Sequence, residues 1–405
     1  MKIIVLKFGG TSVGSISRIK KVSKIIISYA KRKYKVIVVS SAMSGVTNEL
    51  ISKTKKISDD FPSSEKDVIL STGEQVVCAL IAGKLNDLGY KARSWLSWQI
   101  PILTEGNYNA SRITKIYKNK IIRYLKNGGI PVITGFQGIN SEDRLTTLER
   151  GGSDASAIMC AKFFKAKECI IYTDVDGVFT SDPKMIKSAK KINKISYEEM
   201  LEMASLGARV MQPASIQDAR LKRIDVKVKS TFKKKSGTLI TKKSKISNNN
   251  VIRGISFNKN NAKLTLIGVK DKPGVAAAIF KPLYLNSINV DMVVQNISSL
   301  GNETDLTFTI KAEDLSRTQK LIKINKLIKF KKLIINKNVS KVSIIGVGMV
   351  TTPGVTYRMF QALAKKKINI EVISTSEIKI SVLVHKKNLK KSVETLHKEF
   401  KLNIL

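Results

Sequence analysis

The chain of 405 residues is long enough for roughly two to four domains at about 150 residues each. Its 72 lysines and arginines against 31 aspartates and glutamates give a formal net charge of +41, but the basic residues are spread along the whole chain, which favours a solvated basic surface over a dedicated nucleic-acid site. The three cysteines form no CxxC pair, which argues against a disulfide framework and a zinc site.

The first expected element is a short apolar strand that leads into a glycine pair. Residues 3–6 are apolar, the segment from Lys7 to Gly10 follows, and a helical pattern of apolar residues begins near residue 16. Glycines let the backbone approach phosphate oxygens, a lysine adds positive charge, and a helix N-terminus attracts anions. The alternatives are a plain strand-turn-helix corner and a Walker A loop. The Walker A reading fails because positions 15 and 16 carry serine and isoleucine.

Strands and helices are expected to alternate through residues 1–242. This alternation favours a mainly parallel sheet covered by helices on both faces. The polar stretch 243–250, with its three consecutive asparagines, is the expected linker. The expected strands include 3–6, 36–40, 130–134, 169–172 and 226–229, and the expected helices include 73–88, 154–164 and 197–207.

A run of acidic and hydroxyl residues follows the expected strand 169–172. Residues 173–184 read Thr-Asp-Val-Asp-Gly-Val-Phe-Thr-Ser-Asp-Pro-Lys, and open α/β sheets bind ligands at the carboxyl ends of their strands. A calcium EF-hand loop is excluded, because Gly177 stands fourth from Asp174 rather than sixth and no glutamate closes the loop.

The C-terminal part of the chain contains an internal repeat with an offset of 80 residues. The Pro-Gly-Val triplet at 273–275 returns at 353–355, and residues 288–291 match residues 368–371. The alternative is two unrelated α+β fragments, but several matches at one offset favour a duplication. Each copy reads as a strand, a Pro-Gly loop, a helix, a strand and a further hairpin.

Six motifs occur in order along the chain and carry a resemblance to a known family. They resemble the aspartate kinases of the amino-acid kinase family, and the duplicated tail resembles the paired ACT domains of those enzymes. The resemblance covers nearly the whole chain and implies an α/β amino-acid-kinase fold followed by two ferredoxin-like α+β ACT modules. The motifs lie at residues 7–12 (Lys-Phe-Gly-Gly-Thr-Ser), 40–43 (Ser-Ser-Ala-Met), 71–74 (Ser-Thr-Gly-Glu), 135–138 (Gly-Phe-Gln-Gly), 150–154 (Arg-Gly-Gly-Ser-Asp) and 173–184.

The resemblance also implies a division into domains. The kinase domain is expected at 1–242, the linker at 243–250, the first ACT module at 251–338 and the second at 339–405. Strand 251–257 is placed in the first module by its position in the sequence, whereas the resemblance allows it to complete the second.

The implied reaction is ATP-dependent phosphorylation of the side-chain carboxylate of L-aspartate to 4-phospho-L-aspartate. This is the first step toward lysine, threonine and methionine, and Mg²⁺ is expected to be carried by ATP rather than by a protein metal site. A carboxylate with a reference pKa of about 3.9 is already ionised at neutral pH. Catalysis therefore depends on positioning and charge neutralisation, and the only histidines, His385 and His397, lie far along the chain from the glycine loops.

Roles for individual residues follow from the resemblance. Lys7 and Asp154 are implied as catalytic, with Asp154 holding the Lys7 ammonium, although Asp154 also suits a helix N-cap. Arg150 would bind the α-carboxylate of aspartate and Glu74 its ammonium, whereas either residue alone would suggest an ordinary surface ion pair. The implied ATP contacts are Lys7, Phe8, Gly9, Gly10, Ser41, Thr173, Asp174, Phe179, Thr180, Ser181, Asp182, Pro183, Lys184 and Arg209. The implied aspartate contacts are Thr47, Glu74, Arg150, Gly151, Gly152 and Ser153.

Three positions depart from the usual pattern of the family. Glu149 stands where relatives usually have glycine, Arg209 replaces a lysine that is usual near the phosphates, and Ala214 falls where arginine is common. Arginine keeps the charge of lysine but changes its geometry.

The ACT modules are expected to bind lysine, threonine or both as feedback effectors and to form a homo-oligomer. The alternative is that the repeats serve only dimerisation. The implied effector contacts are Asp271, Pro273, Gly274, Val275, Ala276, Asn289, Val290, Asp291, Gln295, Pro353, Gly354, Val355, Asn369, Ile370, Glu371, Thr375 and Ser376.

Two other functions stay open at this point: another carboxylate or carbamate kinase of the same fold, and a nonenzymatic basic nucleic-acid binder. The expected partners are aspartate, ATP, the effectors and further copies of the chain, without nucleic acid or membrane. A cytoplasmic location is expected, because residues 1–6 are too short for the apolar region of a signal peptide and no run approaches the ~18 apolar residues of a membrane span.

Overall fold

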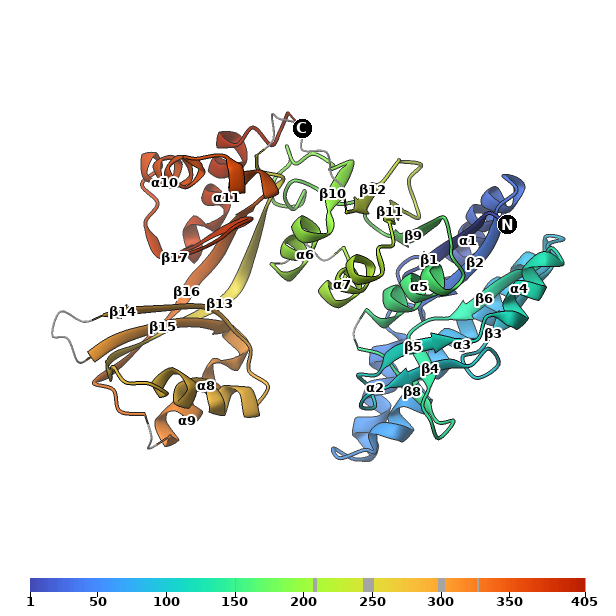
Figure 1. Ribbon diagram of the computed structural model, residues 1–405, viewed down its shortest axis with the longest axis horizontal. Helices are drawn as coiled ribbons and strands as arrows, with labels where there is room; N and C mark the ends of the chain where they lie inside the picture. The colour runs from blue at the N-terminus through green and yellow to red at the C-terminus, as the bar shows by residue number, and fades with distance from the viewer. Residues whose placement is uncertain (150, 207–209, 243–250, 298–302, 326–327, 405) are drawn as a thin grey trace. The chain divides into compact units, whose positions relative to one another are not determined.

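The computed structural model describes residues 1–149, 151–206, 210–242, 251–297, 303–325 and 328–404 (Figure 1). The chain divides into two units. Unit 1 contains Met1–Val178 and Lys191–Lys245, and unit 2 contains Phe179–Lys190 and Ile246–Leu405. Residues 179–190, from the first half of the sequence, therefore belong to the second unit. The sequence alone predicts instead that residues 1–242 form one continuous domain. The expected linker 243–250 lies outside the described residues.

Unit 1 is built on a sheet with the strand order β10-β12-β11-β9-β1-β2-β6-β3. Every neighbouring pair runs parallel except β11 with β12. Strands in the middle of the sheet are apolar and almost fully buried, as expected when helices cover both faces. The strands are β1 (Ile3–Phe8), β2 (Lys35–Ser40), β3 (Ala92–Trp95), β6 (Ile130–Thr134), β9 (Glu168–Thr173), β10 (Lys194–Ser196), β11 (Val226–Ser230) and β12 (Thr238–Thr241).

Helices pack on opposite sides of β1, which confirms the expected α/β architecture. Side chains alternate along a strand, so Leu6 and Phe8 join the core shared with α1 and α3, whereas Lys7 faces α5 and pairs there with Asp154. The helices of unit 1 are α1 (Ile16–Lys31), α2 (Val46–Ile57), α3 (Ser63–Asp87), α4 (Asn119–Lys126), α5 (Gly152–Phe163), α6 (Tyr197–Ser205) and α7 (Pro213–Lys222).

A second, smaller sheet in unit 1 was not anticipated from the sequence. Its order is β5-β4-β7-β8, and β8 packs against α3. The strands are short, so their periodicity is too brief to stand out in the sequence. They are β4 (Ile102–Glu105), β5 (Arg112–Ile116), β7 (Gln137–Ile139) and β8 (Leu145–Thr147).

Helix α3 is long and apolar enough to cross a membrane, judged by length and composition alone, so the expectation that no segment reaches this threshold was wrong. The helix is nevertheless a core element of unit 1. Its Val77 and Ile81 are completely buried with residues of β1 and α1, and the polar side chains of Asp67 and Glu74 are buried on the same helix.

Unit 2 is a sheet in the order β14-β15-β13-β16-β18-β17, with α8 beside α9 and α10 beside α11 (Figure 1). The central strands β13 and β16 each serve both repeats, since residues 254–258 pair with 341–345 and residues 263–267 pair with 332–336. The elements are β13 (Gly254–Lys270), α8 (Val275–Leu285), β14 (Val290–Ile297), β15 (Glu303–Lys311), α9 (Leu315–Ile324), β16 (Lys332–Ile345), α10 (Val355–Lys365), β17 (Ile370–Ser376), β18 (Lys379–His385) and α11 (Leu389–Glu399).

The two Pro-Gly loops have the same local structure, as the sequence repeat predicts. Gly274 caps α8 with a φ of 90° and Gly354 caps α10 with a φ of 86°. This left-handed conformation is accessible to glycine at little cost, which explains why the glycine recurs in both copies.

The segment 179–190 belongs to unit 2 because it contributes to the core of the second repeat. Ile186 is buried in the cluster that contains Val342 and Val382. The Thr180 carbonyl accepts a hydrogen bond of 2.7 Å from the backbone N–H of Ile255. These partners are distant in sequence, so no local pattern around residue 180 could reveal them.

Candidate active site

The loop after β1 is fixed to the ends of the two neighbouring strands. The Gly9 N–H donates to the Tyr172 carbonyl on β9 at 3.1 Å, and the Ser41 N–H donates to the Phe8 carbonyl at 3.1 Å. A Cβ on Gly10 would lie 2.9 Å from the Ala42 carbonyl oxygen, closer than real Cβ contacts allow. The glycine therefore permits a close approach between the β1 and β2 loops at the carboxyl end of the sheet.

Lys7 and Asp154 form a buried ion pair. The Lys7 Nζ lies 2.6 Å from the Asp154 Oδ1, and the two side chains are only 9% and 10% exposed. Lys7 comes from the penultimate position of β1, and Asp154 comes from the first turn of α5. The carboxylate fixes the direction of the ammonium in a region where water is largely excluded, which strengthens its interaction with an anionic ligand.

Two helix N-termini line the same cavity as this ion pair. Gly45 caps α2 and Gly151 caps α5, both in the left-handed conformation and both without a side-chain hydrogen bond to the first turn. The first N–H of each helix donates to a carbonyl of the preceding loop, Val46 to Met43 and Gly152 to Glu149, but the positive end of each helix dipole still favours anionic groups such as phosphates and carboxylates.

Glu74 contributes a buried carboxylate from α3. Its Oε1 accepts a hydrogen bond of 2.9 Å from the Ala42 N–H, while its Oε2 is buried without a hydrogen-bond partner among the described residues. Burial raises the pKa of Glu74 to about 7, and the Ala42 N–H and the charge of Lys7 only partly oppose this shift. A cavity-lining carboxylate oxygen that lacks a partner is suited to a ligand ammonium group.

Lys7, Glu74, Gly45 and Gly151 line a cavity of about 630 Å³ in unit 1. Within the described residues, no group of three or more histidine, cysteine or acidic side chains could hold a metal ion. Mg²⁺ typically needs only one or two carboxylates when substrate phosphates supply the other oxygens, and Asp154 is the nearest such group to Lys7. The cavity is lined by Lys7, Gly10, Ser41, Ala42, Met43, Ser44, Gly45, Thr47, Asn48, Ile51, Lys66, Leu70, Glu74, Asn109, Phe136, Thr147, Leu148, Gly151, Gly152, Ser153 and Gln212.

The structure thus brings together many of the residues expected to bind aspartate or phosphate. Lys7, Ser41, Thr47, Glu74 and Ser153 all contribute to one cavity, although they come from β1, α2, α3 and α5 and their adjoining loops. Two expected contacts, Arg150 and Arg209, lie outside the described residues. Of the other unusual positions, Glu149 and Ala214 are exposed.

The residues expected to frame the nucleotide fall into two groups. Thr173 and Asp174 end β9 in unit 1, where the Thr173 hydroxyl donates to Asp174 Oδ1 at 3.1 Å. The run from Phe179 to Lys184 belongs to unit 2, where the hydroxyl of Thr180 lies 2.9 Å from His397 Nε2. None of the residues from Phe179 to Lys184 is among those that line the cavity of unit 1, and their contact with ATP stays a prediction.

Sequence reasoning missed several residues of the cavity wall. Asn109 and Thr147 line the cavity, and both are hydrogen-bonded to Asp67, which is completely buried. One signal was available: Asp67 precedes Glu74 by seven positions and so lies on the same side of α3. Gln212 had no comparable signal, because its position depends on the packing of α7 against α5.

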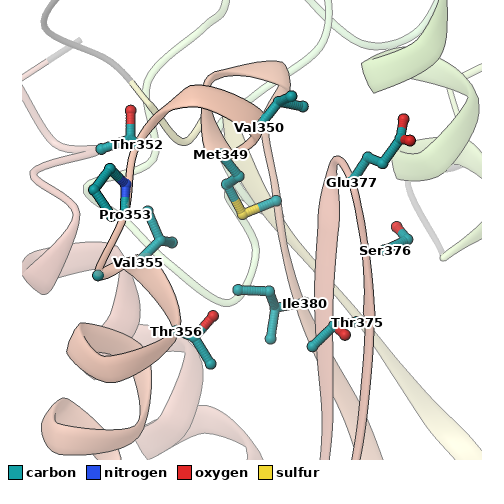
Figure 2. Close-up of a pocket in the computed structure, with 11 residues that line it drawn as sticks. Met349, Val350, Thr352, Pro353, Val355, Thr356, Thr375, Ser376, Glu377 and Ile380 are labelled. Carbon is teal, nitrogen blue, oxygen red and sulfur yellow. The ribbon is translucent and has the colours of Figure 1, made fainter.

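A second cavity, of about 430 Å³, lies in the second repeat of unit 2. Figure 2 shows Thr356 and Ile380 between the start of α10 and the hairpin of β17 and β18. Expected effector contacts on this cavity are Pro353, Gly354, Val355, Thr375 and Ser376. The remaining lining residues are Met349, Val350, Thr352, Thr356, Glu377 and Ile380.

Two of the expected effector carboxylates are already paired within unit 2. Asp291 forms an ion pair with Lys341, and Glu371 lies 2.7 Å from the Nζ of Lys263. Both pairs join one repeat to the other, because Asp291 and Lys263 belong to the first copy and Lys341 and Glu371 to the second. Other expected contacts are exposed, namely Asp271, Pro273, Gly274, Ala276, Asn289, Gln295 and Asn369, and Val275, Val290 and Ile370 are partly buried.

Comparison with known proteins agrees with the motifs and the fold. A family model described as the amino acid kinase family matches residues 2–230, and a model described as the ACT domain matches residues 264–323 and 342–400. The aspartate kinase of Pseudomonas putida is 45% identical over 405 residues, covering 100% of this chain and 98% of that protein. Aspartokinase 2 of Bacillus subtilis is 41% identical over 404 residues, with the same coverage.

Solved structures lead to the same family. The crystal structure of E. coli aspartokinase III in complex with aspartate and ADP matches with a TM-score of 0.79 and 25% sequence identity, covering 98% of this chain and 99% of that one. Two family models, full-length relatives well above 30% identity and this structural match are mutually consistent. The chain therefore belongs to the aspartate kinases, enzymes of the amino acid kinase family that here carry two ACT domains.

Proposed function

We propose that this enzyme uses Mg-ATP to phosphorylate the side-chain carboxylate of L-aspartate, yielding 4-phospho-L-aspartate for the synthesis of lysine, threonine and methionine. The observation that carries the proposal is the cavity of unit 1, where the buried Lys7–Asp154 pair and Glu74 meet two uncapped helix N-termini. The proposed site of action is the cytoplasm.

Each part of the cavity has a role in this reaction. Lys7 neutralises charge that develops on the transferring phosphoryl group, and Asp154 keeps its ammonium in place. The Gly9–Gly10 backbone approaches the phosphates, and Mg²⁺ bound with ATP screens their charge. Glu74 accepts hydrogen bonds from the substrate ammonium group. The N-terminus of α5 and Arg150 attract the substrate carboxylates. The E. coli structure with aspartate and ADP supports this choice of ligands.

The reaction is tested by trapping the acyl phosphate as a hydroxamate. Purified enzyme with Mg-ATP should form aspartyl hydroxamate well above the level obtained with glutamate, because the longer side chain moves its carboxylate away from the fixed Lys7 ammonium. Equal or better activity on glutamate would refute the assignment of aspartate as the substrate. Activity without added Mg²⁺ would refute the role of the metal.

We further propose that the ACT modules sense lysine, threonine or both, and that they mediate a homo-oligomer. The cavity at the second Pro-Gly loop supports this proposal, because it combines the N-terminus of α10 with hydroxyls of Thr352, Thr356 and Thr375. Lysine or threonine should inhibit at saturating aspartate and ATP, because the effector site is separate from the active site. If neither amino acid changes activity or thermal stability, the modules are structural only.

A further inference from the structure

Helix α3 carries a polar stripe on an otherwise apolar core helix. Asp67, Ser71 and Glu74 are spaced so that they lie on one side of the helix, and all three are buried. The Ser71 carbonyl accepts a hydrogen bond of 2.9 Å from the side-chain amide of Gln137 on β7. Through Asp67 and the Ser71 carbonyl, α3 therefore contacts β8 and β7 of the small sheet, whereas Glu74 contacts the Ala42 loop.

Asp67 holds two separate parts of the cavity wall. Its Oδ2 accepts from the Thr147 N–H at 2.7 Å and from the Asn109 N–H at 3.0 Å, and its Oδ1 accepts from the Thr147 hydroxyl at 2.5 Å. Asn109 has a φ of 63°, a left-handed conformation that a hydrogen bond to its N–H helps to fix. Asp67 is not itself among the residues that line the cavity.

We infer that Asp67 is a positioning residue for aspartate binding, acting through Thr147 and Asn109, which both line the cavity. The inference rests on the proposed function. Asp67 holds Thr147 by two hydrogen bonds, and Leu148, Gly151 and Gly152, which follow Thr147 in the sequence, also line the cavity. The same helix carries Glu74, the proposed partner of the substrate ammonium.

Burying the Asp67 carboxylate costs free energy, because burial disfavours an ionised group. Asp67 is fully buried, and burial raises its pKa against the opposing effect of the bonds from Thr147 and Asn109. The hydrogen bonds from Thr147 and Asn109 offset part of this free-energy cost. Two backbone N–H donors aimed at one oxygen require an acceptor there, and a carboxylate supplies it while its other oxygen accepts from the Thr147 hydroxyl.

The test is Asp67→Asn in the full chain, with steady-state kinetics for both substrates. If the amide oxygen accepts from both N–H groups, the NH2 group faces the Thr147 hydroxyl, so the charge of the acceptor is lost and the hydroxyl must accept instead of donating. We expect the aspartate KM to rise at least about tenfold, while the ATP KM stays within about twofold, because the contacts concern the aspartate end of the cavity. Asp87→Asn, at the exposed end of the same helix, is the matched control and should leave both constants unchanged.

A second pair of variants keeps the inference testable if Asp67→Asn does not fold. Thr147→Val removes only the hydroxyl donor and should raise the aspartate KM, whereas Thr147→Ser retains that donor and should restore it. An unchanged aspartate KM in folded Asp67→Asn, or equal losses in Thr147→Val and Thr147→Ser, would refute the positioning role. A wild-type enzyme that fails to phosphorylate aspartate refutes the proposed function, and the inference with it. An active wild type with insensitive variants refutes the inference alone.

Discussion

At the scale of single residues, the active site depends on charges removed from water. The Lys7 ammonium and the Asp154 carboxylate are fixed against each other, so the lysine does not have to reorganise as charge develops on the phosphoryl group. Glu74 has one oxygen bonded to Ala42 and the other without a partner among the described residues. These two settings suit the two tasks proposed above: transition-state stabilisation for Lys7 and substrate binding for Glu74.

Lys7→Ala should therefore act mainly on kcat. We expect a decrease of about 100-fold or more, because an electrostatic group that is preorganised for the transition state is lost, with a smaller change in the aspartate KM. Steady-state assays with both substrates measure the effect. Lys20→Ala, on the exposed side of α1, is the control, and a Lys7→Ala enzyme with near wild-type kcat would contradict the assigned role.

The raised pKa of Glu74 predicts that aspartate binding depends on pH. Burial raises the pKa of Glu74 to about 7, so the ionised form that attracts the substrate ammonium is lost as pH falls through this value. The aspartate KM should rise by roughly tenfold between about pH 8 and about pH 6. Glu74→Gln should have a high KM that no longer changes over this range, and a wild-type KM that is constant with pH would exclude this role.

At the scale of elements, α3 links the substrate cavity to the core. It contacts α1, α2, β3, β6 and β8, and its residues hold both the Ala42 loop and the end of β8. Gly73 is the point of closest approach, since a Cβ there would lie 2.8 Å from the Cβ of Ala42. Gly83, on the same helix, has nothing within 4 Å of such a Cβ.

Gly73→Ala and Gly83→Ala form a matched pair. Alanine in a helix is favoured over glycine by about 0.5–1 kcal/mol, so Gly83→Ala should stabilise the protein. In Gly73→Ala this gain is outweighed by overpacking, which costs about 1–3 kcal/mol. The displaced Ala42 loop should also weaken aspartate binding through Glu74. The unfolding temperature and the aspartate KM are measured for both variants. Equal changes in Gly73→Ala and Gly83→Ala would contradict the close packing at Gly73.

The sequence predicted the main strands of the kinase unit well, because apolar runs such as 130–134 are buried on both faces and flanked by turn residues. It also predicted that Lys7, Glu74 and Ser153 lie near one another, since each adjoins a motif of the family. It did not reveal Asp67, whose partners Asn109 and Thr147, the latter at the end of β8, lie far along the chain. It likewise gave no sign that 179–190 packs with unit 2, because that packing depends on Ile255 and His397.

At the scale of the whole molecule, the segment 179–190 connects the two units through the chain itself. It leaves unit 1 after Val178 and returns at Lys191, and within unit 2 the hydroxyl of Thr180 meets the buried His397 at 2.9 Å. His397 makes this attachment sensitive to pH.

Burial lowers the pKa of His397 below its usual value of 6.5, so the folded chain holds it neutral. As pH falls below about 6.5, the unfolded chain binds this proton first, and the stability present above that pH is lost. The unfolding temperature of unit 2 should therefore fall between about pH 7.5 and about pH 5.5. His397→Gln, which retains a hydrogen-bonding amide, should reduce this dependence, whereas the control His385→Gln should not. An unaltered pH dependence in His397→Gln would contradict the assignment.

Because β13 and β16 run through both ACT repeats, neither repeat can be cut out of the chain intact. Residues 254–258 precede the first copy in sequence yet supply a strand to the second, and each copy lends a lysine to an acid of the other. A chimera that exchanges only residues 339–405 would bring in a module without its outer partner strand and with mismatched ion pairs. A chimera should therefore keep the regulatory properties of the donor only when the whole block from about residue 251 onward is exchanged.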